Sequence, residues 1–327
     1  MTSSGTRFDS IESRILSLYR IRALRSDNYH VFGRFNLRLQ TLAVVVSALF
    51  LLSGCARQRP VRVGTKVFTE QLVLGEILTQ HLQKKLSVPV ERKFSIGDTT
   101  LVHQAFQAGE IDLYPEYTGT ALTSILKLDS ISEPSVVLER CRQEYRSRMA
   151  AEWMEPLGFD NSFAMVVRAE DARAHGLETI TDAQRVAAGW RLATGFEFQM
   201  RRDGLSNINR NYKLPWRGAV RVMPLSMLYE ALEKGSIDMA AGNVTDGLLK
   251  SFATKILKDD KSIFPPYQAA VVVRQDALSA VAGLQDALHQ LSGRIDEETM
   301  RQLNFEVDGK RRSPSDVAGE WLKAAGL

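Results

Sequence analysis

Short apolar runs alternate with amphipathic stretches along residues 61–120. Residues 61–64 and 88–94 have the length and apolar character of strands. Between them, leucines recur at helical spacing, at Leu74, Leu78, Leu82 and Leu86. A helix-like run over 101–108 stops at Gly109, and residues 111–114 then predict a short buried strand. Because strand and helix alternate, the pattern predicts an α/β fold with a mostly parallel sheet and right-handed crossovers.

The same alternation returns after residue 189 with a different sequence. Strands are expected at 190–194, 220–223 and 237–241, and helices at 197–202 and 226–234. Segment 231–238 aligns with segment 105–112, and each reads as a helix end, a glycine cap and a strand. Any α/β unit can show this order, but its recurrence favours two similar lobes.

Two apolar runs, 162–168 and 267–274, lie where one α/β pattern stops and the next begins. We interpret them as the crossover strands of a two-lobed clamp with an interlobe cleft, although two ordinary core strands would look alike. Lobe 1 is therefore predicted over 61–161 and 268–327, and lobe 2 over 162–267. The tail, 278–327, is helical in pattern, with Trp321 and Leu322 expected to pack on lobe 1.

The N-terminal segment reads as an export signal. Residues 42–52 are nearly all apolar, and Arg34 and Arg38 precede them. The run is too short to span a bilayer comfortably. The sequence Leu-Ser-Gly-Cys at 52–55 resembles a bacterial lipobox, which implies cleavage before Cys55 and lipid on its sulfur. Residues 1–54 are thus predicted to be an N-terminal extension with a lipoprotein signal peptide. A signal anchor with an incidental cysteine is the alternative, and translation could also start downstream.

Charge argues against a nucleic-acid partner. The whole chain carries a net charge of +4. The segment before Cys55 alone holds seven arginines and three acids, so the remainder is close to neutral. A nucleic-acid-binding stripe should persist in the folded part. With Cys55 assigned to lipid, Cys141 is alone in a helical context and reads as a small buried hydrophobe.

The first candidate chemistry follows the strand at 111–114. Pro115 should end that strand because it lacks an N–H for the ladder. Tyr114, Tyr117, Thr118 and Thr120 come at this point. In open α/β sheets, ligands sit beyond the carboxyl ends of strands. Aromatic faces there suit a cation without hydrogen-bond donors, such as a quaternary ammonium group.

The sequence offers no candidate residues for catalysis or for binding a metal. None of the five histidines has metal-ligand spacing, and neither a Gly-x-Ser-x-Gly elbow nor a Walker loop occurs. We therefore expect no enzyme activity, no metal and no cofactor, although enzymes also use clefts of this kind.

Six motifs in order resemble the substrate-binding proteins of ABC importers for quaternary-ammonium osmoprotectants such as glycine betaine, choline and carnitine. They lie at 64–71, 109–120, 197–204, 245–247, 259–261 and 264–267. The resemblance spans 61–327 and implies a type II periplasmic-binding-protein fold with the ligand in the interlobe cleft. It also implies a membrane permease, with its ATPase, as partner, and a place on the periplasmic or cell-surface side, held to the membrane by the lipid anchor.

The resemblance also assigns the site. It implies that Tyr114, Phe163 and Tyr267 form an aromatic cage around the ligand, with Phe163 in place of the usual tyrosine. Asn243 stands where the family pattern has a fourth tyrosine. Val67 also replaces a usual asparagine. The polar end of the ligand is expected at Gln71, Thr69 and Thr120, with Tyr117 nearby; Thr69 can also cap the following helix. Lys66 would face a carboxylate or be an exposed loop lysine. Each aromatic could instead be core.

Glu197, Arg201 and Asp203 are interpreted as a structural ion pair and capping group. Because Asn243 and Phe163 depart from the family pattern, a different small zwitterion remains open as the ligand, either an ergothioneine-like betaine or an amino acid. A sensor or accessory protein with a degraded cleft is the alternative from another class.

Overall fold

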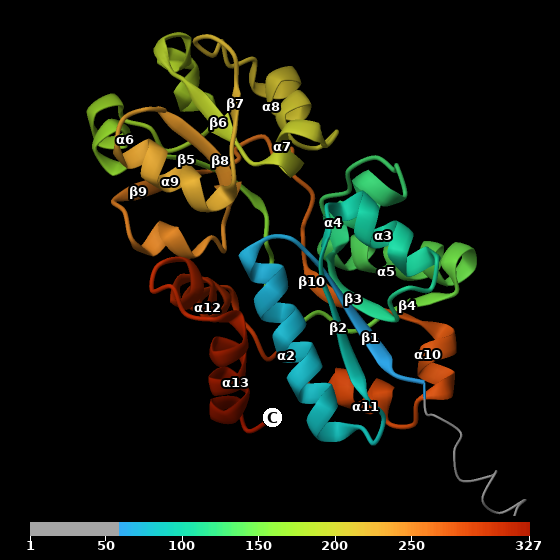
Figure 1. The fold of residues 1–327 in the computed structure, drawn as a ribbon. Helices are drawn as coiled ribbons and strands as arrows, with labels where there is room; N and C mark the ends of the chain where they lie inside the picture. The colour runs from blue at the N-terminus through green and yellow to red at the C-terminus, as the bar shows by residue number, and fades with distance from the viewer. Residues whose placement is uncertain (1–58) are drawn as a thin grey trace, which may run out of the picture. The chain divides into compact units, whose positions relative to one another are not determined.

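Two five-stranded sheets organise residues 59–327, the part of the chain that this computed structural model describes (Figure 1). These residues form one compact unit. The predicted leader, 1–54, and Cys55 lie outside the described residues.

The first sheet has the strand order β2-β1-β3-β10-β4, and the second sheet has the order β7-β6-β8-β5-β9. We call each sheet with the helices packed on it lobe 1 and lobe 2, respectively. The strands are β1 Val61–Lys66, β2 Val90–Gly97, β3 Leu113–Tyr117, β4 Ala151–Trp153, β5 Phe163–Arg168, β6 Leu192–Thr194, β7 Arg221–Val222, β8 Met239–Asn243, β9 Thr254–Leu257 and β10 Ala269–Arg274.

Helices connect these strands in the predicted alternation. They are α2 Thr69–Lys85, α3 Thr99–Gln107, α4 Thr118–Thr120, α5 Pro134–Met149, α6 Ala169–His175, α7 Phe196–Met200, α8 Leu205–Tyr212, α9 Leu225–Glu233, α10 Gln275–Ala280, α11 Leu284–His289, α12 Glu297–Asp308 and α13 Pro314–Ala325. A π-helical turn, η1, covers Ala121–Ile125, and 3₁₀ turns cover Thr181–Arg185 (η2), Ala187–Gly189 (η3) and Gly247–Lys250 (η4). The leucines predicted to repeat on one face of α2 are buried in the lobe 1 core at Leu74, Leu78 and Leu82.

Both sheets are mixed, which corrects the expectation of mostly parallel sheets. β1 is parallel to β2 and β3, and β6 is parallel to β7 and β8. The two predicted crossover strands, β5 and β10, are antiparallel to both of their neighbours. β4 and β9, which the sequence pattern did not predict, complete the two sheets beyond them.

Strand β3 continues through Pro115, where the sequence predicted its end. Its edge toward β1 pairs only at Leu113, while its edge toward β10 pairs through Tyr117. The carbonyl of Pro115 accepts a hydrogen bond from the Gln71 side chain. Because the N and C=O of one strand residue face the same edge, the missing N–H of Pro115 lies on the edge that needs no ladder donor.

The N-terminus of α2 differs from the predicted cap. Phe68 precedes the helix, and Thr69 is its first residue. The Thr69 hydroxyl donates to Asp308 of α12 at 2.7 Å instead of capping α2. In contrast, α3 has a side-chain cap, because Asp98 accepts from the backbone N–H groups of Thr100 and Leu101.

The two lobes share one Asp–Arg interaction, which lies at the end of each of the aligned segments 105–112 and 231–238. Asp112 accepts from the backbone N and the Nε of Arg62 in β1. Asp238 accepts from the same two groups of Arg191, next to β6. In both segments the glycine after the helix has positive φ, 71° at Gly109 and 65° at Gly235. The echo in the sequence thus corresponds to equivalent structure in the two lobes.

The C-terminal helices lie beside α2 (Figure 1). Leu322 is buried in the lobe 1 core and Trp321 packs against it, as predicted. Helix α12 contacts both α2 of lobe 1 and η4 of lobe 2, so it links the lobes in addition to the crossover strands. Within residues 59–327, no helix combines the length and apolar character needed to cross a membrane.

Candidate functional site

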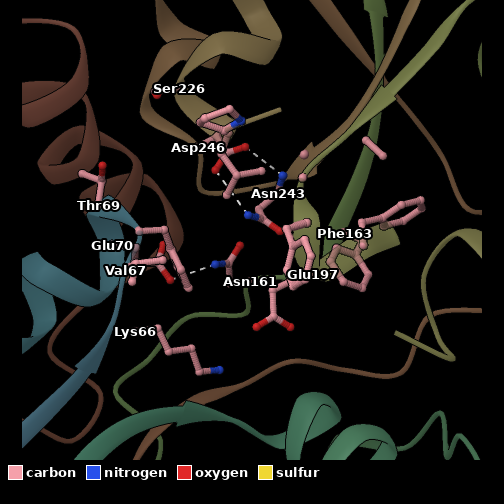
Figure 2. A pocket seen from close by; sticks show the side chains of 18 of the residues that line it. Lys66, Val67, Thr69, Glu70, Asn161, Phe163, Glu197, Ser226, Asn243 and Asp246 are labelled. Atoms are coloured by element: carbon pink, nitrogen blue, oxygen red, sulfur yellow. Dashed lines mark hydrogen bonds between the residues drawn. The ribbon is translucent and has the colours of Figure 1, made fainter. Parts of the chain in front are cut away.

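A cavity of about 540 Å³ lies between the two sheets and draws its walls from both lobes (Figure 2). Lobe 1 contributes the end of β1, the start of α2 and the end of β3. Lobe 2 contributes the start of α7, the start of α9 and the end of β8. The lining side chains that matter below are Lys66, Thr69, Glu70, Tyr117, Thr120, Asn161, Phe163, Glu197, Arg201, Tyr229, Asn243, Asp246, Tyr267, Asn304 and Asp308. The carboxyl ends of the parallel strands therefore meet at this cavity, as in other open α/β sheets.

Hydrogen bonds cross from lobe 1 to lobe 2 at one side of the cavity. The Glu197 carboxylate accepts from the backbone N and the hydroxyl of Thr99, both at 2.9 Å. Arg201 donates to the Thr120 hydroxyl at 2.7 Å, and the Thr123 hydroxyl donates to Asp203 at 2.8 Å. These contacts hold the two walls together around the cavity.

Aromatic rings and one buried cation form the corner next to these contacts. Phe163 meets the Tyr267 ring edge-on, with centroids 5.4 Å apart. The guanidinium of Arg201 lies 4.9 Å from the Phe163 centroid and 5.4 Å from that of Tyr267. Both rings line the cavity. The corner therefore holds the positive charge of Arg201 against two aromatic rings.

Arg201 keeps hydrogen-bonding capacity for a ligand. Its Nε donates to Asp203 at 2.9 Å, and Nη2 bonds the second oxygen of that carboxylate. With the bond from Nη1 to Thr120, three of its five N–H donors have partners among residues 59–327. Burial opposes the charge of Arg201, but Asp203 outweighs this and raises the pKa of the guanidinium. A permanently charged donor thus lines the cavity.

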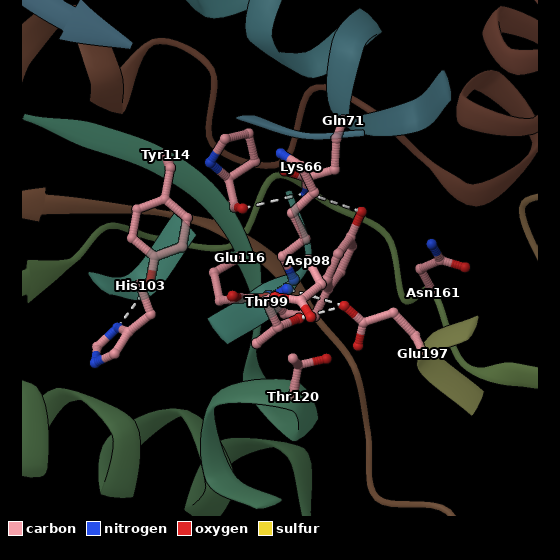
Figure 3. Close-up of polar contacts among 12 residues, drawn as sticks. Lys66, Gln71, Asp98, Thr99, His103, Tyr114, Glu116, Thr120, Asn161 and Glu197 are labelled. Atoms are coloured by element: carbon pink, nitrogen blue, oxygen red, sulfur yellow. Dashed lines mark hydrogen bonds and ion pairs between the residues drawn. The ribbon is translucent and has the colours of Figure 1, made fainter. Parts of the chain in front are cut away.

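Lys66 forms a buried ion pair at the floor of the site (Figure 3). Its Nζ lies 2.7 Å from Glu116, and the side chains are only 3% and 0% exposed. The same Nζ sits 5.3 Å from the centroid of the Tyr117 ring. Burial raises the pKa of Glu116, while Lys66 acts in the opposite direction. Lys66 is therefore neither an exposed loop lysine nor an unpaired charge.

Glu70, which lines the cavity, joins four segments of the chain. Its carboxylate accepts from Tyr117 of β3 at 2.6 Å, from Asn161 at 2.8 Å and from Asn304 of α12 at 3.0 Å. It also accepts from the hydroxyl of Thr245, which follows β8 in lobe 2. Burial raises the pKa of Glu70, and the four neutral donors oppose that shift. Because none of the four is a cation, this carboxylate makes the adjacent part of the cavity acidic.

Asp246 is a second cavity carboxylate that has no ion-pair partner among residues 59–327. One of its oxygens accepts from the Tyr229 hydroxyl at 2.6 Å and from the backbone N of Asn243 at 2.9 Å. Burial raises the pKa of Asp246 to about 7, and the nearby charge of Glu70 acts in the same direction. Asp246 thus changes its charge near neutral pH, at a position that lines the cavity (Figure 2).

The titration of Asp246 predicts a pH-dependent stability. In the unfolded chain this carboxyl has a pKa of about 3.9, so between about pH 4 and 7 the folded state binds one more proton than the unfolded state. The free energy of unfolding of the wild type should therefore fall, relative to Asp246→Asn, as pH rises through this window. We expect a difference of about 2–3 kcal/mol between pH 4.5 and pH 8. Urea unfolding at several pH values measures it.

A matched control for this prediction is Asp182→Asn. Asp182 accepts backbone hydrogen bonds that lower its pKa to about 2, so it stays charged over the same range. Its stability difference from the wild type should be constant from pH 4.5 to pH 8. A constant difference for Asp246→Asn as well would contradict the raised pKa of Asp246.

The structure brings seven of the nine predicted ligand-binding residues to the cavity wall and leaves two behind it. Those at the wall are Lys66, Thr69, Tyr117, Thr120, Phe163, Asn243 and Tyr267. Gln71 is fully buried, and its amide is occupied by the backbone N of Lys66, the carbonyl of Pro115 and the hydroxyl of Tyr117. It positions its neighbours and does not face the cavity.

Tyr114 does not line the cavity, so its assignment as a cage wall needs correction. It is 0% exposed, and its ring packs edge-on against Phe106 with centroids 5.2 Å apart. Its hydroxyl lies 3.4 Å from Nδ1 of His103, away from the cavity (Figure 3). Because side chains alternate across a strand, Tyr114 and Tyr117 face opposite sides of β3. The cavity receives Tyr117.

Several residues at the wall were missed from the sequence. Arg201 and Glu197 were interpreted as structural, and the predicted pairing of Arg201 with Asp203 is present, but both residues also line the cavity. Tyr229 lies on a helix that carried no site signal, and it brings an aromatic ring to the cavity. For Arg201, the available sequence signal was its place in the 197–204 motif, close to Phe198. Among residues 59–327, no cluster of three or more His, Cys, Asp and Glu side chains could hold a metal ion.

Comparisons with known proteins agree on one family. A family model described as the substrate binding domain of ABC-type glycine betaine transport systems matches residues 59–324. The ergothioneine transport permease/ergothioneine binding protein EgtU of Helicobacter pylori is 31% identical over 97% of this chain, which spans 56% of that longer protein. The carnitine transport binding protein OpuCC of Listeria monocytogenes is 30% identical, over 87% of this chain and 95% of its own length.

A solved structure supports the same conclusion. The structure described as a glycine betaine/carnitine/choline ABC transporter has a TM-score of 0.70 and 29% identity, and the match covers 81% of this chain and 98% of that one. The two lobes, the crossover strands and the interlobe cavity agree with the periplasmic-binding-protein fold predicted from the motifs. The chain belongs to the family of substrate-binding domains of ABC-type glycine betaine transport systems.

Proposed function

We propose that the chain is the extracytoplasmic solute-binding component of an ABC importer and that its ligand is a quaternary-ammonium osmoprotectant such as glycine betaine, choline or carnitine. The cavity that combines aromatic rings with the guanidinium of Arg201 carries the proposal. A trimethylammonium group has no N–H, and aromatic faces compete well with water for it. A carboxylate on the same ligand would pair with Arg201 in a charge-assisted hydrogen bond. A small zwitterion matches both features.

The fold supports binding by hinge closure. The chain crosses between the two sheets before β5 and before β10, so we place the lobe boundaries at 161/162 and 267/268. A ligand that contacts both walls stabilises the closed form by its differential affinity for it. The closed protein would then deliver the ligand to a membrane permease and, through it, to the ATPase. The proposal includes no catalytic step, metal or cofactor.

A second candidate ligand is another small zwitterion, either an ergothioneine-like betaine or an amino acid. Asn243 favours it, because this residue lines the cavity where the family pattern has a tyrosine, and its amide can both donate and accept. The name of the Helicobacter pylori relative points the same way. A degraded cleft has less support, since the cavity has about 540 Å³ and a wall that combines polar and aromatic side chains.

Ligand binding tests the proposal directly. In a thermal-melt panel of glycine betaine, choline, carnitine, ergothioneine and several amino acids, we expect a trimethylammonium compound to stabilise the protein. At a hundred times its dissociation constant the gain is about 2.7 kcal/mol. The bound compound should be recovered unchanged. Stabilisation by amino acids alone would contradict the ligand class, and stabilisation by none would favour the accessory role.

Anchoring through Cys55 has its own test. Cys55 lies outside the described residues, so the proposal rests on the lipobox-like sequence at 52–55. We expect the wild type to fractionate with membranes and Cys55→Ala to lose the lipid and be released wherever the signal is still cleaved. A cleaved Cys55→Ala protein that remains in the membrane fraction would contradict the anchor.

A further inference from the structure

Asp246 is a carboxylate at the cavity wall with unused hydrogen-bonding capacity. Its Oδ2 has two good donors, Tyr229 and the backbone of Asn243. Within the described part of the chain, its Oδ1 has only the Asn243 side-chain amide, at 3.4 Å. No Lys, Arg or His of residues 59–327 lies within ion-pair distance of it, whereas Glu197, another carboxylate of the cavity wall, lies 3.8 Å from Arg201. A carboxylate oxygen can accept two hydrogen bonds, so Oδ1 can take a donor from a ligand.

The backbone is shaped to hold this carboxylate in place. Gly242 in β8 has no side chain, and a Cβ at that position would lie 2.3 Å from the Tyr229 hydroxyl and 2.7 Å from Oδ2 of Asp246. Tyr229 is itself 1% exposed. The pair therefore occupies space that only glycine leaves open. Asp246 is a fixed part of the wall and not a side chain that swings freely into solvent.

The cavity is polarised between its two ends. Asp246 and Asn243 lie at one end of the side chains drawn in Figure 2, and Lys66 and Glu197 lie at the other. Glu70, which also lines the cavity, adds a buried carboxylate that raises the pKa of Asp246 by repulsion. A ligand carboxylate is disfavoured near these two acids, whereas Arg201, which also lines the cavity, keeps N–H donors that its partners do not use. The charges thus orient a zwitterion with its carboxylate away from Asp246.

What reaches the ionised form of Asp246 must be a hydrogen-bond donor, because a carboxylate only accepts. A trimethylammonium group has none, so glycine betaine leaves Oδ1 without a ligand partner and fills only part of a cavity of about 540 Å³. A site built to bond an N–H or O–H group discriminates strongly against analogues that lack it, because its buried polar atom is then left unpaired.

We infer that Asp246, held by Tyr229 and Asn243, is a specificity subsite that accepts a hydrogen bond from an N–H or O–H group of the ligand. The chain therefore selects a trimethylammonium zwitterion that carries such a donor over glycine betaine, which lacks one. This inference rests on the proposed function, since it assigns a second contact to the same ligand in the same cavity.

Calorimetric titration of three compounds tests the inference on the purified protein and on Asp246→Asn. The compounds are glycine betaine, with no donor, carnitine, with a hydroxyl, and ergothioneine, with a ring N–H. We expect the wild type to bind at least one donor-bearing compound about tenfold or more tightly than glycine betaine. Asp246→Asn should lose that preference while its affinity for glycine betaine changes less than about twofold. Tyr229→Phe, which removes one support of Asp246, should weaken the preference in part.

The outcomes separate this inference from the proposed function. If glycine betaine binds as tightly as the donor-bearing compounds, or if Asp246→Asn weakens all three equally, the inference is overturned and the proposed function stands. The wild-type comparison alone decides this even if a variant fails to fold. If none of the three binds, the inference is overturned, and the thermal-melt panel, which also contains choline and amino acids, decides the proposed function.

Discussion

Lys66→Met is expected to lower the free energy of unfolding by about 3–5 kcal/mol. The variant removes one partner of an ion pair whose side chains are 3% and 0% exposed. Glu116 would keep only the backbone N–H of Tyr117 for its paired oxygen, and it would remain in a buried position as an uncompensated charge. Burial already raises the pKa of this carboxyl, so part of the loss appears as proton uptake. Urea unfolding at pH 7.5 measures the effect.

The double variant Lys66→Met/Glu116→Gln distinguishes a buried charge from lost packing. Replacing both members of a buried pair by neutral groups of similar size is often close to neutral in stability. We therefore expect the double variant to recover most of the loss. Lys93→Met is the matched control on the neighbouring strand, because Lys93 and Glu91 are 48% and 45% exposed and such pairs contribute about 0–1 kcal/mol. Equal losses in all three variants would contradict the role of the buried charge.

Arg201→Ala is expected to weaken ligand binding by a hundredfold or more, which corresponds to about 2.7 kcal/mol or more. The variant removes the cation that lies over Phe163 and Tyr267 and the donors that would receive a ligand carboxylate. It also leaves Asp203, which is 4% exposed, without its cation. Losing one partner of a buried, hydrogen-bonded charge pair costs about 2–5 kcal/mol in measured interfaces. Calorimetric titration with the compound that gives the largest thermal shift measures the affinity.

Arg202→Ala is the control for this variant. Arg202 is the next residue in the chain, carries the same charge and is exposed, and it does not line the cavity. Its affinity should equal that of the wild type within about twofold. Arg201→Lys retains a charge but not the planar fork, so it should recover only part of the binding. If Arg201→Ala bound as well as Arg202→Ala, the ligand carboxylate would have to lie elsewhere.

Two predictions from the sequence were wrong and one was confirmed, and in each case the tertiary structure supplied the reason. Pro115 was expected to end β3, but the strand continues because its β1-facing edge is outside the ladder beyond Leu113. Tyr114 was expected in the cavity, but the strand's alternation places Tyr117 there. The apolar runs at 162–168 and 267–274 were expected to be crossover strands, and β5 and β10 occupy those positions. The first and third outcomes depended on which strands became neighbours, and the second on which face of β3 turned toward the cavity.

The sequence alone was sufficient for the alternation of helices and strands, the doubled α/β pattern, the crossover strands and the family. These follow from local periodicity, turn residues and short motifs, which one stretch of chain contains in full. It also pointed to Lys66, Phe163, Asn243 and Tyr267, all of which lie at the cavity wall.

Only the tertiary structure decided what the cavity can bind. Glu70 and Asn304 are 234 residues apart in the chain and meet at 3.0 Å. Arg201 reaches across to Thr120 of the other lobe, and Asp246 depends on Tyr229 and on the space left by Gly242. The charge and hydrogen-bonding capacity of these side chains are set by neighbours from distant segments and by burial, and no local pattern records them.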